Sequence, residues 1–112
     1  MKVGIIGGGP AGSVLAATLA RRGHQAVVFE KTVFPRFHIG ESLLPCNGPI
    51  FAAIGITPAD FAAEGFPAKH AAHFEHVGSG RWVRFPFADA LAGDPPSIFQ
   101  VERSRFDHLL LR

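Results

Sequence analysis

A short stretch near the N-terminus, Lys2 to Ala20 (KVGIIGGGPAGSVLAATLA), places the strongest constraint on what this chain can fold into. It opens with the apolar, β-branched residues Val3, Ile5 and Ile6, which predict a buried parallel strand. Three glycines in the spacing G-x-G-x-x-G follow, and then an alanine- and leucine-rich run that predicts a helix ending at two arginines and a glycine. This order of strand, glycine turn and helix is typical of a unit that binds phosphate groups.

Each glycine of the turn has a distinct physical role. Gly7 allows the sharp reversal from strand to helix, Gly9 has no Cβ and so leaves room for a pyrophosphate, and Gly12 lets the helix pack closely on the strand. Pro10 and Ala11 open the helix, and the unpaired N–H groups at that end would face the phosphates. These five residues are therefore predicted to bind a phosphorylated ligand.

A second strand and an acidic residue complete the unit. Gln25–Phe29 (QAVVF) predicts a parallel strand that ends at Glu30. A carboxylate there can accept hydrogen bonds from both ribose hydroxyls and would repel a 2′-phosphate. The complete pattern predicts a dinucleotide site, and the alternative is a glycine-rich loop without a ligand.

Composition narrows the class of protein. The chain has 112 residues, is 47% hydrophobic and carries a formal net charge of +2, which fits a globular α/β protein with many loops. The basic residues are scattered, so no nucleic-acid partner is expected. The single cysteine, Cys46, favours a reduced, cytoplasmic setting and is expected to be a packing residue. No signal peptide, membrane span or membrane partner is expected.

The end of the chain bears on domain organisation. Arg103 to Arg112 predicts the first turns of a helix and then stops without a cap. Only two parallel strands are evident, and a doubly wound sheet needs more to bury its centre. We expect residues 1–112 to be the N-terminal portion of a single domain of a longer protein, with no second domain present and an incomplete parallel sheet.

The region between the second strand and the end contains a long loop and several short elements. Lys31 to Pro45 (KTVFPRFHIGESLLP), called the strap below, is predicted to be an extended loop that contacts the ligand or, alternatively, a plain surface loop. Arg36 is a candidate for the phosphates or ribose, and Gly40 for the close approach of backbone N–H groups to a flat ring. The later elements are predicted as helices at about 49–54 and 57–64, a hairpin of strands 69–77 and 81–87, a proline-rich loop at 88–96 and a strand at 98–102.

Three histidines at regular spacing, His70, His73 and His76, raise the question of a metal site. On a helix they would lie near one face, but on the predicted strand His73 points away from the other two. We therefore expect no metal ion to be bound.

With these motifs described, the chain resembles the flavin-dependent halogenases and related FAD monooxygenases over its whole length. The resemblance is carried by GGGPAGSVLAATLARRGHQAVVFEK, FPRFHIGESLLP and VERSRFDHLLLR. It implies an α/β fold, the start of a Rossmann-like FAD-binding domain of the glutathione-reductase type. It also implies FAD as the cofactor, a separate flavin reductase as partner, and a small organic substrate halogenated with oxygen and halide.

The resemblance also nominates site residues. In this family a lysine that positions or captures hypohalous acid precedes a phenylalanine at the spacing seen here for Lys69 and Phe74, so Lys69 is the candidate catalytic residue. Arg103, in V-x-R-x-x-F-D, is a candidate flavin contact or, alternatively, a surface charge. The full set of expected cofactor-binding residues is Gly7, Gly9, Pro10, Ala11, Gly12, Glu30, Lys31, Arg36, Gly40, Glu41, Ser42 and Arg103.

Two other functions stay open on the sequence. One is an FAD-dependent monooxygenase or a flavoprotein similar to geranylgeranyl reductases, which would share the FAD-binding half and lack halide chemistry. The other is a non-catalytic remnant that binds FAD. We expect the 112-residue chain by itself to be inactive.

Overall fold

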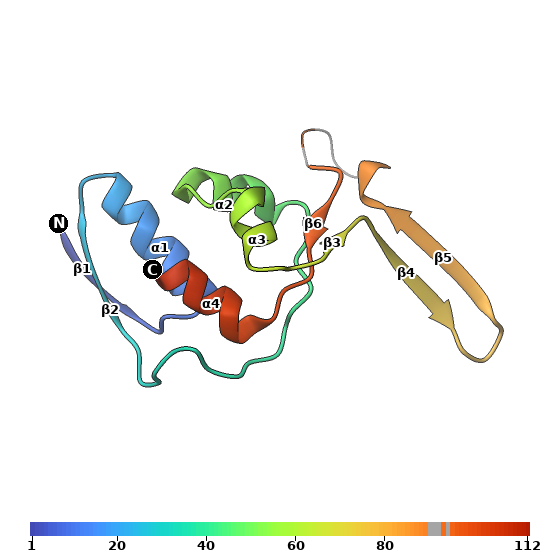
Figure 1. Cartoon of the computed structure of the whole chain (residues 1–112), viewed down its shortest axis with the longest axis horizontal. Coiled ribbons are helices and arrows are strands. Elements are labelled where there is room, and N and C mark those ends of the chain that lie inside the picture. Colours follow the sequence, from blue (N-terminus) through green and yellow to red (C-terminus); the bar gives the residue numbers. More distant parts are fainter. Residues whose placement is uncertain (90–92, 94) are drawn as a thin grey trace.

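The N-terminal unit is a parallel pair of strands joined by a helix, as the sequence predicts. A computed structural model describes residues 1–89, 93 and 95–112. Strand β1 (Lys2–Ile6) pairs in parallel with β2 (Gln25–Phe29), and helix α1 (Pro10–Arg21) connects them and packs on β2. Figure 1 shows this pair at one end of the molecule, beside α1.

The rest of the body is a small cluster of helices around an aromatic core. Helices α2 (Asn47–Ile54), α3 (Pro58–Ala63) and α4 (Arg103–Leu111) gather beside α1 (Figure 1). Five phenylalanine rings from these helices and the adjoining segments pack together in stacked, tilted or edge-to-face pairs, with ring centroids 4.8 to 6.3 Å apart. The buried residues of this core are Phe51, Phe61, Phe66, Val101, Phe106 and Leu110.

Local signals in the sequence explain where these helices begin and end. In α3, the Asp60 carboxylate accepts hydrogen bonds of 2.7 Å from both the backbone N–H and the hydroxyl of Thr57, so Thr57 is the predicted N-cap. Gly55 ends α2 in the left-handed region, with φ of +92°. The predicted start of α2 at Pro49 was wrong, because the helix begins at Asn47. Pro49 lies in the first turn, where its missing N–H needs no partner.

The predicted strand 69–77 is two strands with different partners. The chain breaks at His70: β3 (Ala68–Lys69) pairs with β6 (Ile98–Phe99), while β4 (Ala71–His76) pairs with β5 (Arg81–Pro86). The Phe87 N–H donates a 2.8 Å hydrogen bond to the His70 carbonyl, at the position where the strand changes partner. The predicted strand 98–102 is shorter than expected and ends at Phe99. A short 3₁₀ turn, η1 (Phe87–Asp89), follows β5, and the predicted loop 88–96 lies partly outside the described residues.

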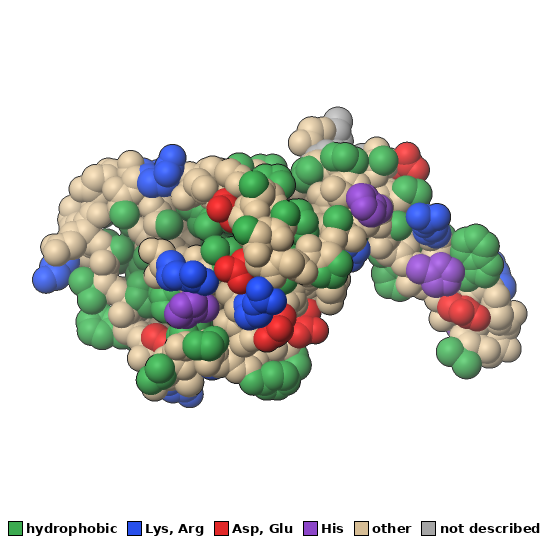
Figure 2. All heavy atoms as spheres, in the orientation of Figure 1, with side chains coloured by type: hydrophobic (Ala, Val, Ile, Leu, Met, Phe, Trp, Pro, Cys, Tyr) green, Lys and Arg blue, Asp and Glu red, His purple; other side chains and the backbone are tan. Residues whose placement is uncertain are grey.

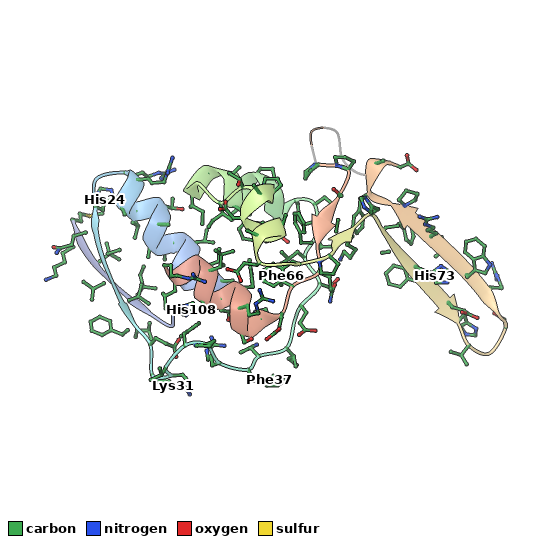
Figure 3. The ribbon with its side chains drawn as sticks, in the orientation of Figure 1. His24, Lys31, Phe37, Phe66, His73 and His108 are labelled. Atoms are coloured by element: carbon green, nitrogen blue, oxygen red, sulfur yellow. The ribbon has the colours of Figure 1, made fainter. Side chains whose placement is uncertain are left out.

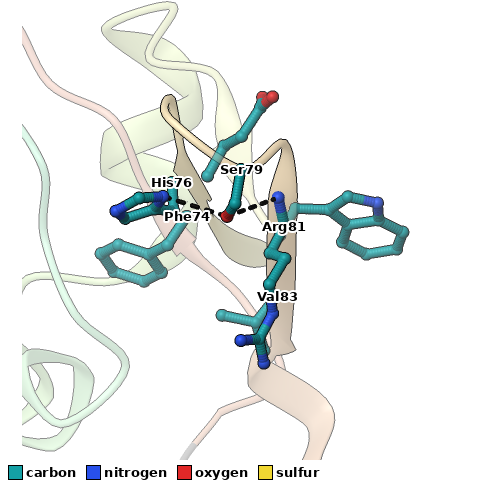
Figure 4. A pocket seen from close by; sticks show the side chains of 7 residues that line it. Phe74, His76, Ser79, Arg81 and Val83 are labelled. Atoms are coloured by element: carbon teal, nitrogen blue, oxygen red, sulfur yellow. Dashed lines mark hydrogen bonds between the residues drawn. The ribbon is translucent and has the colours of Figure 1, made fainter.

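The β4–β5 hairpin projects away from the body and leaves both of its faces exposed (Figures 1 and 2). Trp82 is 66% exposed. One face forms a shallow hollow in which the Ser79 hydroxyl lies 3.0 Å from His76 Nδ1, with Phe74 and Val83 alongside (Figure 4). Apolar side chains on both faces of a two-stranded hairpin indicate a surface that is not covered within this chain.

Three smaller expectations concern histidines, cysteine and membranes. His73 pairs with Arg84 and His76 with Arg81, so the two imidazoles lie on opposite faces of the hairpin. Among the described residues, no group of three potential metal ligands occurs. Cys46 is exposed in the turn before α2, so the expectation of a packing residue was wrong. No helix in the described part of the chain is long and apolar enough to cross a membrane.

Candidate functional site

The glycine turn has the close geometry that its sequence predicts. Gly7 has φ of +100°, a conformation that side chains rarely adopt, and its N–H donates to the Phe29 carbonyl at 2.8 Å. A Cβ on Gly12 would lie 1.9 Å from the Gly7 carbonyl oxygen, so helix α1 can pack this closely only with glycine there. The buried Ser13 hydroxyl donates to the Gly8 carbonyl at 3.0 Å and holds the turn from inside.

Glu30 lies directly across from this turn, at the end of β2. Its carboxylate accepts hydrogen bonds from the backbone N–H of Gly8, at 2.8 Å, and from that of Thr32, at 2.9 Å. These two bonds, the Gly8 bond first, lower the pKa of Glu30 below its usual value of 4.5. The side chain is therefore ionised at neutral pH, held in place, and still has lone pairs available for hydroxyl donors.

Two hollows flank the glycine turn. The first, about 670 Å³, lies at the ends of β1 and β2 and is lined by Gly7, Phe29, Glu30 and Lys31 among others. The second, about 370 Å³, lies at the start of α1 and is lined by Pro10, Ala11, Gly40 and Arg103 among others. The first hollow contains Glu30, the residue predicted to bind the ribose. The second lies where the strap crosses the N-terminus of α1.

The strap carries Arg36 back to the glycine turn. The Arg36 guanidinium lies 4.7 Å from the centre of the Phe34 ring, and its Nη2 lies 3.5 Å from where a Cβ on Gly9 would be. Apart from Gly9 itself and its two chain neighbours, no other heavy atom of the described residues lies within 4 Å of that position. The open side of Gly9 therefore faces a fixed positive charge.

Arg103 is neither a free surface charge nor a free ligand contact. Its Nε and Nη2 donate to the two oxygens of Asp107, at 2.7 and 3.0 Å, and its Nη1 donates to the Ile39 carbonyl at 2.7 Å. Nη1 also approaches the carbonyl of Gly40, whose φ of +93° requires glycine. The surface-charge alternative was therefore wrong, because Arg103 joins α4 to the strap.

The other end of the strap meets Lys69. The Lys69 ammonium donates to the Ser42 hydroxyl at 2.5 Å and lies 5.2 Å from the centre of the Phe87 ring. Partial burial lowers the pKa of Lys69. The backbone of the strap is held here too, because Ser42 forms a bridge with Gln100 and the Glu41 carbonyl accepts the N–H of Val101 at 2.8 Å.

The arrangement fits a dinucleotide on three independent grounds. The cradle at Gly9 is open, and Arg36 supplies a cation beside it. Glu30 supplies an acceptor at the end of β2. The Gly12 contact shows that the turn is built for close approach of α1 to β1, which aims the helix N-terminus at the cradle.

Comparison with known proteins identifies the family. The family model described as tryptophan halogenase matches residues 2–105. The chain belongs to the tryptophan halogenase family.

Known halogenases align with nearly all of the chain. It is 40% identical over 111 residues to the flavin-dependent halogenase armH4 of Armillaria mellea, covering 96% of this chain and 21% of that protein. It is 39% identical to a tryptophan 2-halogenase of Chondromyces crocatus. That alignment covers 99% of this chain and 20% of the relative. The crystal structure of CmlS, a flavin-dependent halogenase, superposes on this chain with a TM-score of 0.88 at 39% identity. The match covers 98% of this chain and 20% of CmlS. The chain thus spans about a fifth of the length of these relatives.

Membership of the family agrees with the predicted fold. The α/β start of an FAD-binding domain, with its strap, short helices and hairpin, is the architecture that the matched halogenase structures share with this chain. Among the described residues, the parallel sheet has two strands, and apolar side chains at their paired ends are uncovered. Ile6 is 95% exposed and Phe29 is 61% exposed.

Most nominated site residues gather around the glycine turn and the strap, and two are peripheral. Lys31 is exposed at the rim of the first hollow, and Glu41 contributes its carbonyl to the backbone while its side chain is exposed. Figure 3 shows Lys31 along the strap, on the opposite side of the body from the hairpin with His73. Sequence reasoning missed Gly8, Ser13 and Asp107. For Asp107 a signal existed, since Arg103 and Asp107 are one helical turn apart.

Proposed function

We propose that this chain forms the FAD-binding portion of a flavin-dependent halogenase in which Lys69 is the catalytic residue. The observation that carries the proposal is the position of one short stretch of the strap, Gly40–Ser42. Gly40 lines the hollow at the start of α1 together with Pro10, while Ser42 accepts a hydrogen bond from Lys69. A ligand at the glycine turn and a lysine that handles an oxidised halide would thus be joined by a fixed backbone.

The residues assigned to FAD divide into three groups by chemistry. Glu30 would accept hydrogen bonds from the adenosine ribose hydroxyls, with Lys31 at the rim of that hollow. Gly7, Gly9 and Gly12, with Pro10 and Ala11 at the helix N-terminus and Arg36 opposite, would hold the pyrophosphate. Gly40, Glu41, Ser42 and Arg103 would border the flavin side.

The relatives support FAD as the ligand, because their names describe flavin-dependent halogenases. A solved structure of the halogenase PltM contains FAD, and its fold matches this chain with a TM-score of 0.70 at 20% identity. When bound and reduced, FAD would activate oxygen for the oxidation of halide to hypohalous acid.

Lys69 has an environment suited to holding hypohalous acid. Its ammonium is tethered by Ser42 on one side and lies near the Phe87 ring on the other, so its position is restricted. Burial lowers its pKa, which makes the ammonium a stronger hydrogen-bond donor than a lysine in bulk water. A hydrogen bond from Nζ to hypohalous acid would keep this small electrophile close to one atom of the substrate.

The partners follow from the same assignment. We propose a separate flavin reductase that supplies reduced FAD, and a small, electron-rich organic substrate. Relatives include a tryptophan halogenase, a pyrrole chlorinase and a sulochrin halogenase. We also propose a cytoplasmic location, since a lone, exposed thiol such as Cys46 suits a reducing compartment.

The test uses the full-length enzyme with a flavin reductase, oxygen, chloride or bromide, and aromatic substrates such as indoles and pyrroles. Lys69→Ala should abolish formation of the halogenated product while FAD binding and release of hydrogen peroxide persist. Lys2→Ala, which removes an exposed lysine of β1, is the matched control and should halogenate normally.

Two results would contradict the proposal. Halogenation by Lys69→Ala at the rate of the unmodified enzyme would make Lys69 a structural residue. Hydroxylation or reduction of the substrate without any use of halide would identify a monooxygenase or a flavin-dependent reductase instead.

A further inference from the structure

The middle of α4 contains a fully buried carboxylate that nothing in the proposed reaction uses. Asp107 is 0% exposed and faces two arginines from different parts of the chain. Arg103 lies one turn earlier on the same helix and binds both carboxylate oxygens, at 2.7 and 3.0 Å. Arg36 comes from the strap and reaches Oδ2 with Nη1 at 3.3 Å.

The two arginines extend from this carboxylate in different directions. Arg103 reaches the strap backbone, where its Nη1 donates to the Ile39 carbonyl at 2.7 Å. Arg36 reaches the glycine turn, where its Nη2 lies 3.5 Å from the position of a Cβ on Gly9. Asp107 is therefore the point at which α4, the strap and the phosphate cradle meet.

Within this group, one buried carboxylate is shared by two guanidinium groups. A carboxylate buried without them would be strongly unfavourable. The geometry from Arg36 Nη1 to Oδ2 falls short of a hydrogen bond, so this buried nitrogen has no hydrogen-bond partner among the described residues. Arg36 thus keeps donor capacity that Asp107 does not use.

Fixing an arginine before a ligand arrives has a clear physical benefit. A free arginine side chain loses rotamer freedom when it binds an anion, and that loss opposes binding. Stacking on Phe34 and pairing with Asp107 already restrict Arg36 in this structure. The entropic loss is then part of folding rather than of ligand binding.

We propose that Asp107 is a positioning residue for the phosphate site, which holds Arg36 beside Gly9 so that its guanidinium is oriented for a pyrophosphate. The proposal rests on the proposed function only in taking a phosphorylated dinucleotide as the ligand. It assigns to Asp107 no contact with that ligand, because the residue acts through Arg36.

The test is a double-mutant cycle on ADP binding, measured by calorimetry with the full-length enzyme. Asp107→Asn and Arg36→Met should each lower ADP affinity by about tenfold, the scale of one charge-assisted hydrogen bond. In the double variant, the loss should be no larger than for Arg36→Met alone. Affinity for adenosine, which has no phosphate, should stay the same in all three variants.

A matched control separates this role from a general effect of removing a carboxylate. Glu64→Gln makes the same chemical change at a residue that pairs with Arg105 and Arg112 on the surface, and it should leave ADP affinity unchanged. If Asp107→Asn does not fold, Asp107→Glu is taken through the same cycle, because it keeps the charge and moves only the carboxylate.

The proposal is overturned if the Asp107 variant loses as much ADP affinity in the Arg36→Met background as in the unmodified enzyme. It is also overturned if adenosine and ADP affinities fall together, since Asp107 would then act on the fold alone. None of these measurements uses halide or substrate. A failure of halogenase activity is therefore distinguishable from a failure of this inference.

Discussion

Gly12 and Gly7 are in such close contact that a methyl group on Gly12 would lie 1.9 Å from the Gly7 carbonyl oxygen. The position of a methyl group on Gly9 is different. Beyond its chain neighbours, the one atom of the described residues within 4 Å is Arg36 Nη2, at 3.5 Å. Two glycines of one motif therefore serve separate purposes. Gly12 is required by the packing of α1 on the turn, whereas we expect glycine at position 9 to be required by a ligand that approaches from outside.

This contrast predicts opposite effects of two alanine substitutions. Gly12→Ala should lower the melting temperature of the protein, because the backbone must shift to relieve the contact. Gly9→Ala should leave the melting temperature nearly unchanged, since its φ of −70° suits alanine, but should weaken FAD binding by occupying the pyrophosphate's place. Thermal unfolding and flavin fluorescence titration of both variants check this. Normal flavin affinity in Gly9→Ala would remove Gly9 from the site.

Glu30 yields a second prediction, about ligand binding. Glu30→Ala should reduce FAD affinity by about tenfold, because the ribose hydroxyls lose a charged acceptor and the Gly8 and Thr32 amides lose theirs. Glu30→Gln keeps the side-chain shape and an acceptor oxygen. Its FAD affinity should therefore lie between that of the unmodified enzyme and that of Glu30→Ala. Affinity is measured in the full-length enzyme. If Glu30→Ala binds FAD as tightly as the unmodified enzyme, Glu30 only stabilises the glycine turn.

The sequence predicts those parts of the site whose contacts join residues close together in the chain. The strand–turn–helix unit was predicted correctly because glycine spacing, strand pattern and helix ends are all local signals. The span before the strap, from Lys2 to Glu30, therefore matched the structure closely. The pairing of Asp107 with Arg103 had a local signal, but its contact with Arg36 could not be predicted, because Arg36 lies far away in the sequence and only folding brings the strap against α4.

The errors have the same origin. The run from Lys69 to Val77 contains no glycine or proline to mark a break, and nothing local indicates that Lys69 pairs with Ile98 while Ala71 pairs with Pro86. Choice of partner depends on long-range contacts rather than on propensity. The environment of Lys69, bonded to Ser42 in the strap, depends on that choice and so could not be derived from its neighbours in the sequence.

A third prediction concerns pH. The pKa of Glu30 is lowered by its bonds to the Gly8 and Thr32 amides, so its folded value lies below its unfolded value. The stability that Glu30 contributes is then fully present above pH 4.5 and is lost as pH falls through the folded pKa. NMR titration should show the Gly8 and Thr32 amide signals moving together with a midpoint below 4.5. In Glu30→Gln this transition should be absent, and a midpoint at or above 4.5 would contradict the assignment.

The last prediction concerns the amine of Lys69. Burial lowers its pKa below the usual 10.5, whereas the hydrogen bond to Ser42 favours the charged form. Ser42→Ala removes that bond and should therefore lower the pKa of Lys69 further. The measurement is a pH titration of reductively ¹³C-methylated lysines by NMR, with Lys2 as an internal comparison and Lys69→Ala to assign the signal. A Lys69 pKa that rises in Ser42→Ala, or that equals 10.5 in the unmodified protein, would mean that the amine is solvated and that the strap does not hold it.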